Sequence, residues 1–148
     1  MATSQIYYGN FGDADQPTLS TISDYVTAAR TELQDTIAPY RYDDASMLTA
    51  FNMTLLEARR LRPDLFVWNL AVRGQVPSFQ AVDDTPLRME PQFRQALVYG
   101  LCGQAMARDQ EDYQDARVAS FMRWFATGLT GKAIDQMTGG SPPRGHPT

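Results

Sequence analysis

The chain has 148 residues, of which 43% are hydrophobic and 20% are charged, and its net charge at pH 7 is -4. A chain of this length and composition forms one domain with a core of its own, which excludes disorder along the whole chain. The acidic balance and the single lysine argue against broad binding to phosphate backbones. No run is apolar enough to span a membrane and no secretory signal begins the chain, so we expect a protein made in the cytosol.

Residues 1–17 carry glycine, proline and scattered aromatic residues without a helical period, which predicts an extended N-terminal arm. The arm is either a frayed terminus or a segment that packs on a neighbouring subunit. The residues that would make that intersubunit contact are Tyr7, Tyr8 and Phe11.

The first predicted helix begins after a cap at Thr18 or Ser20 and runs to about Gln34. Its apolar residues share one face: Ile22, Tyr25, Val26, Ala29 and Leu33. Residues 35–41 then turn into the next helix.

The second predicted helix, about residues 45–62, has a clear signal at each end. Asp43 or Asp44 caps its first turn, and Pro63 disfavours helical geometry at Arg62 and so ends it. Apolar residues recur along it at helical spacing: Met47, Leu48, Phe51, Leu55, Ala58 and Leu61.

Three arginines close this helix, and their role has more than one interpretation. They complement the negative end of the helix dipole in solvent, or they contact phosphate. A further alternative is an ion pair between Arg62 and Asp64 that fixes the direction of the chain after the helix. The cluster comprises Arg59, Arg60 and Arg62.

After Phe66, glycine, prolines and Asp83-Asp84 interrupt the apolar pattern, which predicts a central loop or short hairpin. Such long loops are often functional, and this one is placed to reach a neighbouring subunit or the next component of an assembly. Pro91 suits the first position of a third helix, which we expect to end at about Arg108.

Small residues recur on one stripe of the third helix: Ala96, Gly100, Gly103 and Ala107. A glycine inside a helix costs roughly 1 kcal/mol relative to alanine, so this stripe predicts the close approach of another backbone. We expect the fourth helix, about residues 112–129, to supply it, since Ala116 and Ala119 are also small. The fourth helix carries more aromatic surface than a lone bundle leaves exposed, so part is core and part, at Trp124 and Phe125, is intersubunit surface.

Residues 131–148 are rich in glycine and proline and predict a flexible C-terminal tail, either disordered or ordered only on a partner. The only histidine, His146, lies there, where no fixed geometry supports acid-base catalysis. The lone Cys102 excludes an intrachain disulfide and a cysteine-based zinc site. Acidic pairs fall at turns and helix starts, where capping explains them, so we expect no enzyme, no cofactor and no metal site.

One combination of residues is more specific than helical periodicity. An aromatic and basic segment precedes the second helix, an asparagine lies at its middle, and an Arg-Pro-Asp segment closes it; a second matching piece spans residues 89–99. Over roughly residues 20–130 the chain thereby resembles the bacteriophage head-to-tail adaptor (connector) proteins. The motif residues are Tyr40, Arg41, Tyr42, Asp43, Asn52, Arg62, Pro63 and Asp64.

The pattern and the resemblance together predict an all-α, four-helix bundle-like subunit, with the arm at 1–17, the helical domain at 18–130 and the tail at 131–148. The resemblance implies a homo-oligomeric ring of twelve copies beneath the portal, in the neck of the virion after assembly in the host cytoplasm. DNA would pass through the ring without sequence-specific binding, and a neck or tail protein would dock on it. A head-stopper or tail-completion role is the neighbouring interpretation.

In adaptors of this kind a C-terminal extension commonly docks on the portal, which implies portal contacts by four residues of the tail. These are Lys132, Ile134, Met137 and Arg144. The rival hypothesis is a small helical DNA-binding packaging or regulatory protein that uses the arginines of residues 59–62.

Overall fold

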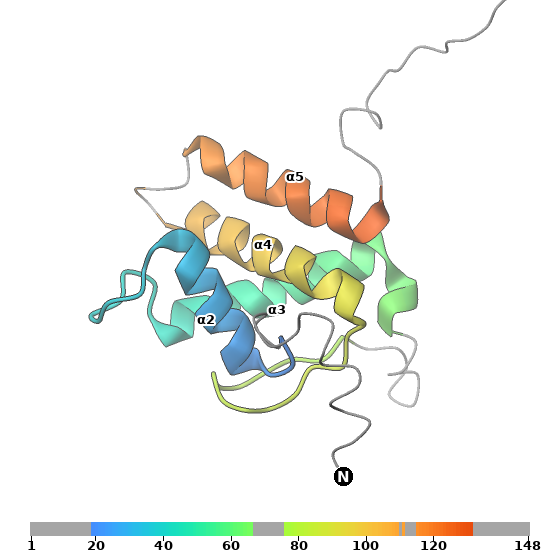
Figure 1. Ribbon diagram of the computed structural model, residues 1–148, viewed down its shortest axis with the longest axis horizontal. Helices are drawn as coiled ribbons and strands as arrows, with labels where there is room; N and C mark the ends of the chain where they lie inside the picture. The colour runs from blue at the N-terminus through green and yellow to red at the C-terminus, as the bar shows by residue number, and fades with distance from the viewer. Residues whose placement is uncertain (1–18, 67–75, 110, 112–114, 132–148) are drawn as a thin grey trace, which may run out of the picture.

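The computed structural model describes residues 19–66, 76–109, 111 and 115–131, and the regular structure in these ranges is helical. Four helices follow one another: α2 (Ile22–Leu33), α3 (Asp44–Leu61), α4 (Pro91–Ala107) and α5 (Ala116–Thr130) (Figure 1). The predicted all-α fold is confirmed. Helix α4 packs against the other three, and it lies between α2 and α5 (Figure 1). None of these four helices is long and apolar enough to cross a bilayer.

Helix α2 begins with a capping box centred on Thr21, one residue beyond the predicted Ser20. The hydroxyl of Thr21 accepts the N–H of Asp24 at 3.2 Å, and the Asp24 carboxylate accepts the N–H of Thr21 at 3.0 Å. Ser20 takes part only by donating its N–H and hydroxyl to Asp24. The cap was therefore misplaced because three hydroxyl residues, at 18, 20 and 21, offer similar local signals.

Helix α3 has the predicted ends. Asp43 is the cap and accepts the N–H of Ser46 at 2.8 Å, whereas Asp44 lies inside the first turn and pairs with Arg30 at 2.9 Å. At the other end Arg62 leaves helical geometry directly before Pro63.

Arg62 then fixes two elements to each other. It forms the predicted ion pair with Asp64, with N···O distances of 2.8 and 2.7 Å, and it donates a hydrogen bond to the carbonyl oxygen of Leu129 at the end of α5. The short-range pair that the sequence suggested therefore also holds the guanidinium in position for a contact 67 residues away.

Helix α4 starts at Pro91 as predicted, but α5 starts at Ala116, after the cap Asp115, rather than at about residue 112. The Asp115 carboxylate accepts the N–H of Arg117 at 2.8 Å, and this hydrogen bond lowers the pKa of Asp115. Several acidic residues precede this helix, and the local pattern does not choose among them.

The core forms where α3, α4 and α5 meet, with α2 closing it from the other side of α4. Cys102 is fully buried and its thiol lies 3.6 Å from the carbonyl oxygen of Ala29; burial raises its pKa to about 12. Cys102 is thus a small buried residue of the core. The largest fully buried side chains include Tyr25, Phe51, Phe66, Phe125, Ile22, Met47, Leu55 and Leu97.

Helix α5 does pack against the glycines of α4, but the contact is made by large side chains of α5. A Cβ at Gly100 would lie 2.6 Å from the Phe125 ring, and one at Gly103 would lie 2.5 Å from the sulfur of Met122. Ala116 and Ala119 are exposed, so the prediction that they meet the glycines of α4 is wrong. Periodicity shows that the stripe needs space, but not whether backbone or side chain fills it.

The described part of the central loop, residues 76–90, forms no hairpin. Its single bridge pairs Pro86 with Thr21, and the N–H groups of Ile22 and Ser23 donate to the carbonyl oxygens of Thr85 and Asp83 at 3.1 and 3.0 Å. The loop thereby satisfies first-turn amides of α2, which have no partner within their own helix.

Candidate functional site

The motif residues before α3 close the turn between α2 and α3. The Asp35 carboxylate accepts the N–H groups of Arg41 and Tyr42 at 2.8 and 3.0 Å. The guanidinium of Arg30 lies 3.9 Å from the centre of the Tyr40 ring and donates to the Tyr42 carbonyl oxygen at 2.8 Å. The backbone of this turn is therefore held by two side chains from its α2 end, Asp35 and Arg30.

Arg41 links this turn to the segment between α4 and α5. Its guanidinium forms ion pairs with Asp109 at 2.9 Å and with Glu111 at 2.8 Å, although 68 and 70 residues separate the partners in sequence. Tyr42 is only 5% exposed beside it. The aromatic and basic motif is thus a junction of three chain segments.

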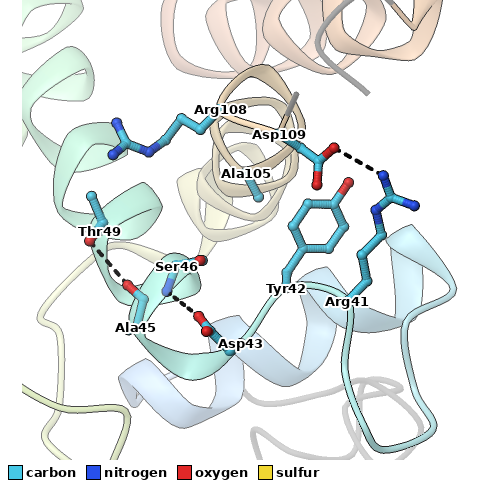
Figure 2. A pocket seen from close by; sticks show the side chains of 9 residues that line it. All are labelled: Arg41, Tyr42, Asp43, Ala45, Ser46, Thr49, Ala105, Arg108 and Asp109. Carbon is cyan, nitrogen blue, oxygen red and sulfur yellow. Dashed lines mark hydrogen bonds and ion pairs between the residues drawn. The ribbon is translucent and has the colours of Figure 1, made fainter. Parts of the chain in front are cut away.

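A pocket of about 340 Å³ opens at this junction (Figure 2). Figure 2 shows Arg41 and Tyr42 on the side of Asp109, while the side chain of Arg108 extends toward Thr49. The lining residues are Arg41, Tyr42, Asp43, Ala45, Ser46, Thr49, Ala105, Arg108 and Asp109.

The lining offers charged and hydrogen-bonding groups that suit the binding of a small polar group. Ser46 and Thr49 supply hydroxyls and Arg41 and Arg108 supply guanidinium groups, while the hydrogen bond from the Ser46 N–H lowers the pKa of Asp43. Among the residues that the structure describes, no three potential ligands gather to hold a metal ion.

Asn52, at the middle of α3, anchors the central loop. Its amide donates to the carbonyl oxygen of Phe79 and accepts the N–H of the same residue, both at 3.0 Å. The Phe79 ring then packs on Phe51 with 5.8 Å between ring centres. This motif position therefore joins α3 to a loop residue 27 positions further along the chain.

Two of the three arginines at the end of α3 form ion pairs with carboxylates. Arg60 pairs with Glu57 within the helix, and Arg62 pairs with Asp64. Only Arg59 lacks a hydrogen bond or ion pair within the described residues. A phosphate contact at this cluster would have to compete with these pairs, which counts against the DNA-binding interpretation.

The predicted intersubunit residues of α5 separate into core and surface. Phe125 is 1% exposed and fills the space beside Gly100, so we no longer assign it to an interface; Trp124 is 48% exposed. The other predicted contact residues lie outside the described residues, and their roles stay predictions: Tyr7, Tyr8, Phe11, Lys132, Ile134, Met137 and Arg144.

Sequence reasoning missed the partners that complete the junction. Arg30 lies next to Ala29 on the apolar side of α2, and an arginine at such a position signals a specific partner. No local signal marks Asp35, Asp109 or Glu111, since acidic residues in turns are common.

Comparisons with models of protein families, with curated proteins and with solved structures find no match to this chain.

Proposed function

We propose that this chain is a structural virion protein, a head-tail adaptor that forms a ring of twelve copies beneath the portal. The ring extends the DNA channel and offers a docking platform for a neck or tail protein. The observation that carries the proposal is the role of the motif residues, which join helices, turn and loop to one another.

The framework they form suits a subunit that keeps its shape under load. Arg41 joins the α2–α3 turn to Asp109 and Glu111, Asn52 joins α3 to the central loop, and Arg62 joins α3 to the end of α5. These links connect segments far apart in sequence and so help to fix the positions of the helices relative to one another.

Exposed apolar side chains support assembly with other chains. Single exposed apolar residues are ordinary on a monomer, but here they lie on several elements and include a tryptophan. They are Ile37 at 82% exposure, Leu56 at 55%, Trp124 at 48%, and Tyr40 and Met53 at 41% each.

The net charge of -4 fits the wall of a channel along which DNA must slide, because repulsion between like charges prevents sticking. The DNA-binding alternative requires the opposite, an exposed and unpaired basic surface.

The test is the mass of the purified chain, alone and mixed with the portal protein of the same genome, by light scattering behind a sizing column. We expect the two proteins to elute together as a complex that contains a ring of this chain. A variant in which a Gly/Ser sequence of equal length replaces residues 132–148 should lose the complex, while retaining the thermal unfolding of the parent.

A chain that stays monomeric and never elutes with the portal contradicts the proposal. Salt-dependent binding to DNA that is abolished by the charge reversals Arg59→Glu and Arg60→Glu would then favour the rival hypothesis.

A further inference from the structure

Charge is distributed unevenly over the described part of the subunit. Residues 19–44, which comprise α2 and the turn into α3, contain five carboxylates and two arginines. Helix α5 contains two arginines and no carboxylate. Because α4 lies between α2 and α5, these unlike surfaces lie on different sides of the subunit (Figure 1).

Exposed and half-buried residues of α5 share one side of the helix, which another surface can approach. We call it the α5 face, and it comprises Ala116, Ala119, Ser120, Arg123, Trp124 and Thr127. Trp124 packs against Tyr99 and Phe121, with ring centres 5.3 and 5.7 Å apart, so its half-exposed ring is held in place.

Arg123 gives the α5 face its charge. It is exposed, and no hydrogen bond or ion pair joins it to another described residue. Arg117, in contrast, pairs with Asp115 at 3.2 Å. The available positive charge therefore lies directly beside the exposed tryptophan.

The second surface lies on α2 and the turn into α3, and we call it the turn face; it comprises Glu32, Ile37, Tyr40, Asp43 and Asp44. Ile37 is 82% exposed at the tip of the turn, and the side chain of Asp44 is 67% exposed although it pairs with Arg30. Glu32 is exposed and has no partner among the described residues.

The turn face is also ordered before any partner binds. Asp35 holds two backbone N–H groups of the turn, and Arg30 holds both the Tyr40 ring and the Tyr42 carbonyl. A surface fixed in this way loses little conformational entropy on binding.

We propose that the turn face of one copy binds the α5 face of the next copy, with Ile37 and Tyr40 against Trp124 and the carboxylates around Arg123. The complementary charges and the exposed apolar residues on both surfaces favour a second copy as the occupant. Two different faces make a heterologous contact, which closes into a ring when the rotation allows it. The inference rests on the proposed function, since it names the contact that joins neighbours in that ring.

A charge exchange tests this contact. Glu32→Arg and Arg123→Glu each place like charges across it and should weaken assembly about tenfold, whereas the chain that carries both substitutions should recover most of the loss. Arg59→Glu is the matched control, because it makes the same charge change on α3, outside both faces, and should leave assembly unchanged.

Assembly is measured by sedimentation velocity over a concentration series at low salt, alone and with the portal protein, after circular dichroism has shown each variant folded. Rescue by the double variant distinguishes a direct contact from two unrelated surface effects.

The outcomes separate the two proposals. Cooperative ring formation on the portal that is equal in the wild type and both single variants overturns the contact and leaves the adaptor proposal standing. Self-association that needs Glu32 and Arg123, without any portal binding, supports the contact and contradicts the adaptor proposal. A wild-type chain that associates with itself in neither setting overturns the contact.

Discussion

The contact between α4 and α5 and the turn between α2 and α3 are both specific, but they achieve specificity by different means. In the first, Phe125 fills the space that Gly100 leaves, so shape in a buried region selects one arrangement. In the second, Asp35 and Arg41 hold the chain by hydrogen bonds and ion pairs near solvent, together with a buried hydrogen bond from Arg30.

This difference predicts where the stability of the subunit lies. Each change in a close-packed core removes contacts that nothing replaces, whereas water replaces much of what an exposed ion pair provides. We therefore expect the α4–α5 contact to dominate the free energy of unfolding, and the turn to govern local geometry.

The largest expected effect separates two neighbouring aromatic residues of α5. Phe125→Ala should lower the free energy of unfolding by about 3–5 kcal/mol, because it empties a buried site. Trp124→Ala, at a half-exposed position, should lower it by about 1 kcal/mol or less. Urea unfolding followed by circular dichroism measures both, and equal losses would contradict the assignment of Phe125 to the core and Trp124 to the surface.

A second pair of substitutions tests the space on α4. Gly100→Ala would place a methyl group 2.6 Å from the Phe125 ring and 2.7 Å from Thr54, so we expect a net loss of about 1–2 kcal/mol despite the better helix propensity of alanine. Gly103→Ala meets the flexible Met122 instead and should be close to neutral. Urea unfolding measures the stability change in both variants. A Gly100→Ala variant more stable than the wild type would show that the α4–α5 contact tolerates expansion.

In the turn, Arg41→Ala should lower the free energy of unfolding by less than about 1 kcal/mol, since the Arg41 and Glu111 side chains are 43% and 79% exposed. Hydrogen exchange should nevertheless become faster at Asp109 and Glu111, which lose their ion pairs with Arg41. Arg60→Ala is the control, because it removes an ion pair that lies within one helix. If Arg41→Ala lowered the free energy of unfolding by more than about 2 kcal/mol, twice the upper range of exposed ion pairs, the turn would contribute to stability as much as a core contact does.

The smallest expected effect on stability concerns Asp43 and appears only at acidic pH. The hydrogen bond from the Ser46 N–H lowers the pKa of Asp43 below its ordinary value of 3.8. The ionised Asp43 carboxylate stabilises the folded state fully at pH values above its pKa in the unfolded chain. This stabilisation is lost as the pH falls through the pKa of Asp43 in the folded chain, because the unfolded chain takes up the proton first. Asparagine also caps helices but does not titrate, so Asp43→Asn should match the wild type at pH 7 and lose less stability as the pH falls below about 4.

Thermal unfolding across this pH range measures the difference. Asp43→Ala serves as the comparison, since it removes the cap at every pH and should be less stable throughout. Parallel acid profiles for the wild type and Asp43→Asn would show that the carboxylate of Asp43 contributes no pH dependence.

Local rules account for most of the helical pattern. The apolar period, a proline at the start of α4 and a proline after α3 gave both ends of α3 and the start of α4, because steric and capping effects act over a few residues. The same rules misplaced the starts of α2 and α5, where several residues could cap. They also could not choose between Asp43 and Asp44.

Local rules could not predict which residues meet at the junction. Tyr40 to Asp43 are distinctive in the sequence, but their partners Asp109 and Glu111 lie about seventy residues away, and an acidic residue in a turn has no local sign of its partner. Long-range pairs depend on which helices pack together, and that depends on the fit of many side chains at once.

Phe125 and Trp124 also show which properties the local sequence determines and which depend on packing. The sequence shows that α5 carries more aromatic area than solvent tolerates, because hydrophobicity and helical period are local properties. Which ring enters the core depends on the space that Gly100 and Thr54 leave on two other helices. Burial is a property of the packed molecule, and so the packing of α5 on α3 and α4 places Phe125 inside and leaves Trp124 at the surface.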